Sequence, residues 1–419
     1  MVRKEWECGT NRSLVAATAV LVLTAIMLAL PESALALPSE TPDNTPMVNG
    51  RVRAIEQVGT NIWLGGRFTQ VKKRDGTVLG NVGNLAVIDS NTNQYKPIKT
   101  SLGGTGAEVW DIVRYGGTGP HANDVLIAGK FVDPINSNHK NLVLVDGTTG
   151  DVIRWYNSPS LKTVLAAPNL PADGGDGRVY GGGVSLSAFD FANSKKLWTR
   201  SKTTVDPTIR THDNSPAYRD LELDADGQTI WAACVCDAVN GNPAKALVKL
   251  DIEGKHDTSW LSEAGAAAFG EAVVDNGEEL FLGAGGSDFV AEFDKAKNGM
   301  RGWVRDTSGS TQALEIMDNQ LVIGGHFYYV ADAGGDRCGA GRPGDAQLDP
   351  YGECQRRQGI AAYSLGGRLN PDWHPAYSGS YSLVWELHVE GSRLHTGGEF
   401  KKVSGVTQNS YARLSPASP

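Results

Sequence analysis

The chain has 419 residues, 51 of them glycine, and its 39 basic and 47 acidic residues give a formal net charge of −8. This acidic balance, with no clusters of Lys and Arg, argues against a surface built to bind nucleic acid or anionic lipid. So much glycine at ordinary hydrophobicity favours strands and tight turns over helices.

Residues 1–36 are predicted to be a secretory signal peptide. Three basic residues precede position 13, a run without charge extends from 14 to 30, and Ala-Leu-Ala stands at 34–36. This order predicts cleavage after Ala36. The alternative is an uncleaved anchor, but the run is shorter than the roughly 20 residues that cross a bilayer. The mature protein is therefore expected to be secreted, without stable membrane insertion.

One strand pattern recurs seven times in the rest of the chain. It is an apolar strand that runs into small residues, in several copies as Gly-Gly-x-Phe, at 63–68, 126–131, 179–183, 230–234, 280–285, 321–327 and 394–400. A second strand follows each copy and ends in Asp or Ser, at intervals of 43 to 70 residues. Such intervals are typical of four-stranded propeller blades. Residues 48–415 are therefore predicted to form an all-β, seven-bladed β-propeller of four-stranded antiparallel blades.

The outermost strand of the blades is marked by a tryptophan in five copies. These are Trp155, Trp198, Trp260, Trp303 and Trp373. The last copy stops at Ser415 without such a strand, whereas residues 37–47 precede the first copy. This N-terminal segment is predicted to supply the missing strand, which would cover an exposed edge and close the array.

The Gly-Gly-x-Phe strand, the following Leu-Ala-x-Leu-Asp-like strand and the tryptophan together resemble the delta-sixty-type repeat propellers of secreted bacterial proteins. The resemblance covers about residues 48–415. The fourth copy departs from it at Ala232-Ala233, and the third and fifth copies lack the Phe. The resemblance implies a propeller and an extracellular location, but it supplies no catalytic residues.

A column of carboxylates is the first candidate site. The strand before each Gly-Gly copy carries an acid at its third position in five of seven copies, at Asp111, Asp220, Glu271, Glu315 and Glu386. If this strand is innermost, these groups line a central channel, with Arg53 and Arg219 on or beside the column. Alternation along the strand sends the neighbouring Trp110, Tyr218, Phe269 and Trp385 to the other face, as core residues. The alternative is a position at a channel mouth, where aromatic platforms beside carboxylates would suit a sugar or a cationic group.

Three interpretations of the column follow from the cost of burying a carboxylate in an apolar strand. The first is a water-filled channel in which each carboxylate caps backbone amides of an adjacent blade. The second is a site for a cation such as calcium, which takes six to eight oxygen ligands. The third is catalysis. No other cofactor is indicated, because the eight histidines show no metal-ligand spacing.

Cys234 and Cys236 are separated by one residue. Same-face positions of a strand lie too far apart for an unstrained disulfide, so a bulge, free buried thiols and pairing with other cysteines all stay open.

The longest departure from the repeat is the loop at 331–358, which is the second candidate site. Cys338 and Cys354 bracket most of it and are predicted to form a disulfide in an oxidising compartment. Long loops on a rigid scaffold commonly carry binding surfaces. The candidate contact residues are Arg337, Arg342, Tyr351, Arg356 and Arg357.

From these features we expect a monomeric extracellular binding or scaffold propeller that recognises a protein or a cell-envelope glycan through loops at one mouth. The alternative is a propeller enzyme, a lyase or hydrolase that uses the channel carboxylates, with or without calcium.

Overall fold

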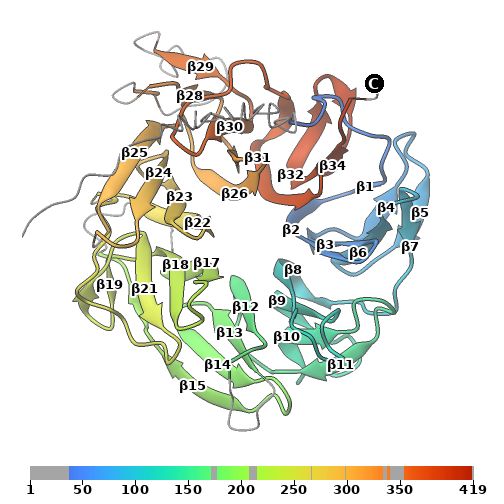
Figure 1. Cartoon of the computed structure of the whole chain (residues 1–419). Coiled ribbons are helices and arrows are strands. Elements are labelled where there is room, and N and C mark those ends of the chain that lie inside the picture. Colours follow the sequence, from blue (N-terminus) through green and yellow to red (C-terminus); the bar gives the residue numbers. More distant parts are fainter. Residues whose placement is uncertain are drawn as a thin grey trace, which may run out of the picture. The chain divides into compact units, whose positions relative to one another are not determined.

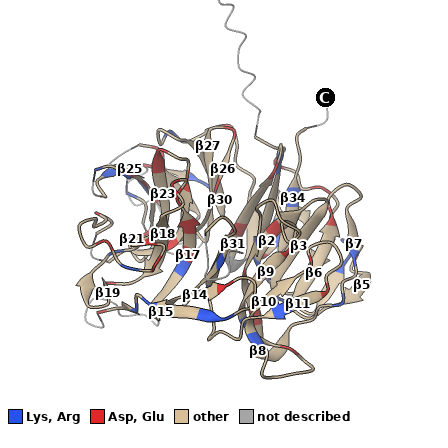
Figure 2. Cartoon of the chain, turned by 60° about the horizontal axis from the view of Figure 1, so that its bottom comes forward, with Lys and Arg blue, Asp and Glu red and all other residues tan. Residues whose placement is uncertain are grey.

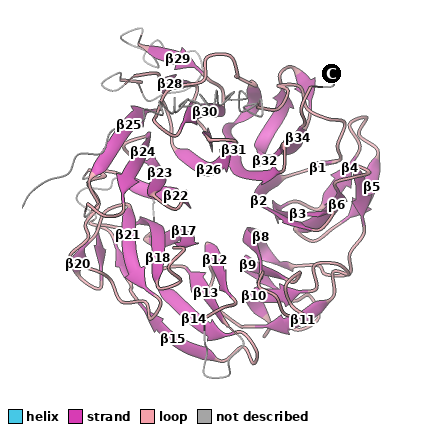
Figure 3. Cartoon of the chain, in the orientation of Figure 1, coloured by secondary structure: helices cyan, strands magenta, loops and turns pink. Residues whose placement is uncertain are grey.

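The computed structural model describes residues 37–170, 177–206, 215–265, 267–297, 299–333, 337–339 and 353–417. Over these residues the protein consists of strands, turns and loops, and the strands form small antiparallel sheets (Figure 3). No helix in the described part of the chain is long and apolar enough to span a membrane. The prediction of an all-β protein is confirmed.

Seven of the sheets follow one another along the chain, and neighbouring strands in each are antiparallel (Figure 1). The first three have four strands each: β2 (Arg51–Val58), β3 (Asn61–Arg67), β6 (Leu85–Asp89) and β7 (Gln94–Lys96); β8 (Gly103–Arg114), β9 (Val125–Val132), β10 (Lys140–Val145) and β11 (Val152–Trp155); β12 (Thr163–Ala167), β13 (Arg178–Gly182), β14 (Leu186–Asp190) and β15 (Lys196–Arg200).

The other four of these sheets are less uniform. Their strands are β17 (Ala217–Leu223), β18 (Thr229–Val235) and β21 (Leu247–Asp251); β22 (Phe269–Asp275), β23 (Glu279–Gly285), β24 (Phe289–Asp294) and β25 (Arg301–Asp306); β26 (Thr311–Met317), β27 (Gln320–Gly325) and β30 (Ile360–Ser364); β31 (Tyr377–Glu390), β32 (Arg393–Val403), β33 (Val406–Thr407) and β34 (Tyr411–Leu414).

Three smaller sheets lie outside this series. They contain β1 (Met47–Val48), β4 (Gln70–Lys72) and β5 (Val78–Asn81); β16 (Thr203–Thr204), β19 (Ala238–Val239) and β20 (Asn242–Pro243); and β28 (Tyr329–Ala331) and β29 (Cys354–Arg356).

The expectation of a tryptophan on an outer fourth strand holds for three sheets. Trp155, Trp198 and Trp303 lie on β11, β15 and β25. In the fourth and sixth sheets, which have three strands among the described residues, Trp260 and Trp373 lie outside any strand. In the sixth sheet a single bridge from Tyr363 to Leu369 replaces the outer strand. Proline follows it at 371 and 375, and proline cannot donate to a ladder.

The first strands of the seven sheets contact one another in chain order. β2 contacts β8, and the contacts continue through β12, β17, β22 and β26 to β31; β31 in turn contacts β2. The hydrophobic core lies between neighbouring sheets. One cluster, for example, joins Trp63 and Leu85 of the first sheet to Val109, Ile127 and Val143 of the second.

The Gly-Gly pairs permit this packing because each glycine occupies a different narrow space. A Cβ on Gly65 would lie 2.4 Å from Cγ1 of Val109 in the next sheet. A Cβ on Gly66 would lie 2.1 Å from the carbonyl oxygen of Arg51 in its own sheet. Gly397 and Gly398 repeat the arrangement in the last sheet, facing Val52 Cγ1 and the carbonyl oxygen of Leu383.

The N-terminal segment lies beside the last strand of the chain. The N–H of Ser39 donates to the carbonyl of Ser415 at 2.9 Å, and that of Asp43 donates to the carbonyl of Arg413 at 2.8 Å. The Arg413 guanidinium also bonds to the Asp43 carboxylate at 2.5 Å. Residues 39–43 therefore cover the free edge of β34.

Candidate functional site

A β-bulge in the first strand of the sheets shapes the candidate site. In the described residues, six of the seven first strands shift register by one residue at this point, and β12 does not. A bulge leaves one residue unpaired and redirects its side chain. The unpaired residues are Arg53, Trp110, Arg219, Glu271, Gln312 and Trp385.

All six of these side chains line one cavity of about 560 Å³. Lys162, which immediately precedes β12, supplies the same position from the third sheet. We call these seven residues the cavity set: Arg53, Trp110, Lys162, Arg219, Glu271, Gln312 and Trp385. Every one of the seven sheets therefore contributes at least one side chain to a single cavity. Figure 2 colours the basic and acidic positions along the strands.

Two tryptophans and two cations of the cavity set form a stack. The Arg53 guanidinium lies 3.6 Å from the ring centroid of Trp385 and 3.8 Å from that of Trp110. Lys162 Nζ lies 3.0 Å from the Trp110 centroid. Such contacts attract a cation to the face of an aromatic ring. Arg53 also forms an ion pair with Glu108, although burial lowers the pKa of Arg53 to about 10.

Two further donors of the cavity set are buried without a hydrogen bond. Arg219 Nε and Trp385 Nε1 have no hydrogen-bond partner among the described residues. The nearest carboxylate oxygen to Arg219 Nε is Glu271 Oε2, at 3.9 Å. That separation is an ion pair but exceeds hydrogen-bonding distance. Both donors therefore lie unsatisfied in the wall of the cavity, and an acceptor reaches them only if neighbouring side chains move.

Asp111 and Asp220 lie one residue beyond the cavity set and bond to the backbone of the next sheet. Asp111 Oδ2 accepts the N–H of Val164 in β12 at 2.7 Å. Asp220 Oδ2 accepts the N–H of Val273 in β22 at 2.9 Å. Burial raises the pKa of Asp111 to about 7 even though the Val164 bond opposes the shift, and it also raises the pKa of Asp220.

The same device recurs further along the first strands. Glu56 Oε2 accepts the N–H of Arg114 at 3.0 Å, and Glu315 accepts the N–H of Val389. Burial raises the pKa of Glu56 to about 7 and that of Glu315 to about 8. We call these four groups the carboxylate bridges: Asp111, Asp220, Glu56 and Glu315. They match the interpretation in which channel carboxylates cap the amides of an adjacent sheet.

The prediction that five carboxylates share one strand position was therefore wrong for two of them. Asp111, Asp220 and Glu386 do share one position, and all three line the cavity. Glu271 is itself an unpaired bulge residue and lies one position earlier. Glu315 lies two positions later and does not line the cavity. Burial, reinforced by Asp111 and Asp220, raises the pKa of Glu386 well above its ordinary value.

The prediction that the flanking aromatic residues are core is confirmed for Tyr218, whereas Trp110 is half-buried and Trp385, although buried, faces the cavity. Tyr218 is fully buried and its hydroxyl donates to the carbonyl of Ser201 at 2.8 Å. Trp110 and Trp385 line the cavity instead, and Phe269, although buried, also contributes to its wall. Strict alternation fails at a bulge, because two successive side chains then face the same side.

No metal centre is evident in the part of the chain that the structure describes. No group of three or more His, Cys, Asp and Glu side chains there is arranged to hold an ion. Calcium binding stays a prediction.

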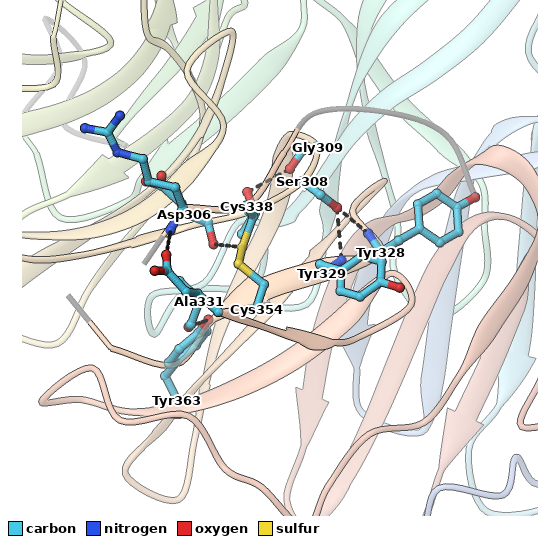
Figure 4. The surroundings of a disulfide bond; sticks show 12 residues. Asp306, Ser308, Gly309, Tyr328, Tyr329, Ala331, Cys338, Cys354 and Tyr363 are labelled. Atoms are coloured by element: carbon cyan, nitrogen blue, oxygen red, sulfur yellow. Dashed lines mark hydrogen bonds between the residues drawn. A yellow bond between two sulfur atoms is a disulfide. The ribbon is translucent and has the colours of Figure 1, made fainter. Parts of the chain in front are cut away.

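The disulfide between Cys338 and Cys354 is present, as predicted (Figure 4). Cys338 Sγ lies 3.5 Å from the carbonyl oxygen of Asp306, at the end of β25. Nearby, Ser308 Oγ accepts the N–H groups of Tyr328 and Tyr329 at 2.9 and 3.0 Å. The loop is therefore held at Cys338 beside the end of β25, and the residues just before the loop are held by Ser308, which lies between β25 and β26.

Of the five candidate binding residues in this loop, the structure describes three, and these differ in exposure. Arg337 and Arg356 are exposed. Arg357 is buried, and its guanidinium donates to the carbonyl oxygens of Asn370 and Pro371 at 3.1 and 3.3 Å. The prediction that Arg357 contacts a ligand is wrong, because its buried guanidinium instead bonds to the segment that follows β30. Arg342 and Tyr351 lie outside the described residues.

Cys234 and Cys236 form a disulfide with each other. Cys234 lies in β18, whereas Cys236 follows the last residue of that strand, and their Cα atoms are 5.4 Å apart. The separation falls within the usual disulfide range because the chain leaves the extended conformation there. The argument that same-face residues of a regular strand lie too far apart for a disulfide therefore does not apply here, at the end of β18.

No protein-family model and no curated protein matches this sequence. Among solved structures, the chain is similar to the crystal structure of the computationally designed Ika8 protein. The identity is 12%, the match covers 89% of this chain and 99% of that chain, and the TM-score is 0.48. Such a distant likeness carries no argument about this protein.

Proposed function

We propose that the seven sheets are the blades of a closed β-propeller and that the protein is a secreted binding module whose ligand enters the cavity. Two observations support closure. The first strands contact one another in a cyclic order, and residues 39–43 bond to the final strand. The predicted signal peptide and the two disulfides are compatible with export, because structural disulfides persist in oxidising compartments.

The convergence of the cavity set carries the proposal. A scaffold without a ligand gains nothing by placing Arg53, Lys162, Arg219 and Glu271 in one partly buried space, because each charge loses hydration there. Small-molecule sites, by contrast, combine a preformed cavity of this size with a few convergent polar groups. The bulges place those groups on rigid strands, so little ordering cost is expected on binding.

Binding is tested with the purified mature protein, residues 37–419, on an array of bacterial envelope glycans and in pull-downs from envelope extracts. We expect wild-type protein to retain a ligand that Arg219→Met and Trp385→Phe weaken by about tenfold, because each removes a buried donor. A variant lacking most of the loop, Cys338 to Cys354 included, separates the two sites. If this variant loses the ligand while the cavity variants keep it, the cavity is not the binding site.

The enzyme alternative makes a different prediction. A lyase or hydrolase would convert its ligand, and Glu386→Gln would abolish turnover while leaving binding intact. Asp111 and Asp220 are poorly suited to that chemistry, because each has an oxygen engaged by the backbone of the next sheet. Product formation from a retained ligand would establish the enzyme alternative.

A further inference from the structure

The cations of the cavity set are unequally neutralised. Arg53 pairs with Glu108, and Arg219 Nε lies 3.9 Å from Glu271 Oε2. Lys162 has no ion pair and no side-chain hydrogen bond among the described residues, and its ammonium faces only the Trp110 ring. Asp111, Asp220 and Glu386 also line the cavity, and burial raises the pKa of each of these carboxyl groups towards its neutral form. Lys162 is therefore the lining cation without an ion pair among the described residues.

The electrostatics around Lys162 point the same way. Burial, followed by repulsion from Arg219 and Arg53, lowers the pKa of Lys162 to about 7, against a weaker attraction by Glu108 and Glu271. The charged form of a lysine is disfavoured in this position. An anion placed beside it would relieve both the desolvation and the repulsion.

The rest of the lining suits hydroxyl groups. His326 accepts the N–H of Ser310 through Nε2 and faces Gln312 Oε1 through Nδ1, both at 3.3 Å. Burial lowers the pKa of His326 to about 4, so the ring is neutral and adds no charge at neutral pH. Gln312, Trp385 Nε1 and Glu271 place donors and acceptors around the same space, and Phe269 provides an apolar face.

We infer that the cavity binds a sugar acid, with its carboxylate between Lys162 and Arg219 and its hydroxyls towards Gln312, Glu271 and Trp385. A carboxylate matches the guanidinium and the ammonium, and a ring bearing several hydroxyls matches the dense polar lining. The inference rests on the proposed binding function and names the ligand class for the same cavity.

Proton uptake is a distinctive consequence. The bound carboxylate favours the charged form of Lys162, whose charged neighbours are Arg53, Glu108, Arg219 and Glu271. The carboxyl groups of Asp111, Asp220 and Glu386 line the same cavity. Near pH 7.5 the free amine is partly neutral, so sugar-acid binding takes up protons. A neutral sugar that binds in the same place has no such effect.

The experiment is isothermal titration calorimetry with two matched probes, D-glucuronate and methyl glucoside, in buffers of different ionisation enthalpy at pH 7.5. We expect glucuronate to bind at least about tenfold more tightly than the glucoside and to take up protons. Lys162→Met should remove both the preference and the proton uptake. Lys140→Met, at an exposed lysine outside the cavity, is the control and should change neither.

Several outcomes overturn this inference while leaving the proposed function in place. They are equal binding of the two sugars, glucuronate binding that Lys162→Met does not weaken, and tighter binding of an acidic tetrapeptide than of glucuronate. In each case the cavity still binds a ligand, which Arg219→Met would show. If neither sugar nor the peptide binds, and no array or extract ligand depends on the cavity, the proposed function fails together with the inference.

Discussion

The cavity set and the carboxylate bridges lie on the same strands but use charge in opposite ways. Asp111 is bonded to a backbone N–H of the next sheet, whereas Lys162, about one position nearer the strand start, has only an aromatic ring as a partner. The difference teaches that one position along the first strand can change the role of a charged group. Asp111 and Asp220 join two sheets through a backbone N–H, whereas the residue one position earlier in each sheet lines the cavity.

The largest effect is expected from Gly66→Ala, which attacks the bulge itself. The new Cβ would lie 2.1 Å from the carbonyl oxygen of Arg51, so the backbone that presents Arg53 must move. We expect the free energy of unfolding to fall by about 3 kcal/mol. Urea denaturation measures it. Gly119→Ala, where no atom lies within 4 Å, is the matched control and should be neutral within about 0.5 kcal/mol.

Next in size is the loss of a carboxylate bridge. Asp111→Ala leaves the Val164 N–H without its acceptor, and we expect it to cost about 2 kcal/mol. Asp111→Asn keeps an acceptor oxygen and should cost clearly less. If thermal or urea melts show equal losses of stability for the two variants, the hydrogen bond from Val164 to Asp111 is not what stabilises the protein at this position.

The bridges also predict a pH dependence of stability. The pKa of Glu315 is about 8 in the folded protein against an ordinary 4.5. The folded state therefore binds the proton more tightly, and the carboxyl group costs stability as pH rises from about 5 to 8. The free energy of unfolding of Glu315→Gln should rise relative to that of the wild type by on the order of 2 kcal/mol between these pH values. If the difference in unfolding free energy between the two proteins stays constant with pH, the pKa of the Glu315 carboxyl is not raised by folding.

The smallest effect, of opposite sign, is expected at Lys162. Because its folded pKa of about 7 lies below the ordinary value of 10.5, the amine costs most stability below pH 7, and the cost disappears towards pH 10. Lys162→Met should stabilise the protein by about 1 kcal/mol at pH 6, and less at pH 9. Arg53→Met should instead destabilise it, since it removes the closer of the two arginines that pair with Glu108. Melts at the two pH values distinguish these results.

Much of the strand pattern was predictable from the sequence, because apolar runs ending in Gly-Gly and Asp recur with little change. Asp294 illustrates this, since its carboxylate accepts the N–H groups of Ala296 and Lys297 in the expected turn. The Cys338–Cys354 disulfide was predictable from its polar, irregular surroundings.

The candidate site was only partly predictable. A bulge adds a residue without changing the apolar pattern, so Glu271 and Glu315 were aligned with Asp111 although neither shares its position. Lys162 was missed because β12 has no bulge and the lysine lies just before the strand. A signal was present, since the residue before the carboxylate column is large and polar or aromatic in several copies, as at Arg53, Trp110 and Arg219.

The pairing of residues 39–43 with the final strand has a consequence for chain connectivity. Ser39 and Ser415 are hydrogen-bonded neighbours, so a short linker could join residue 417 to residue 37 without spanning the molecule. New ends opened at an exposed turn, such as the one at Gly277 between β22 and β23, would then give a permuted chain in which the seventh sheet and residues 39–43 are continuous in sequence, while the fifth sheet is divided between the two ends. In such a permutant a covalent link would reinforce the contact between residues 39–43 and β34. The order in which the sheets leave the ribosome would change, but each sheet would keep the same neighbours in the folded protein.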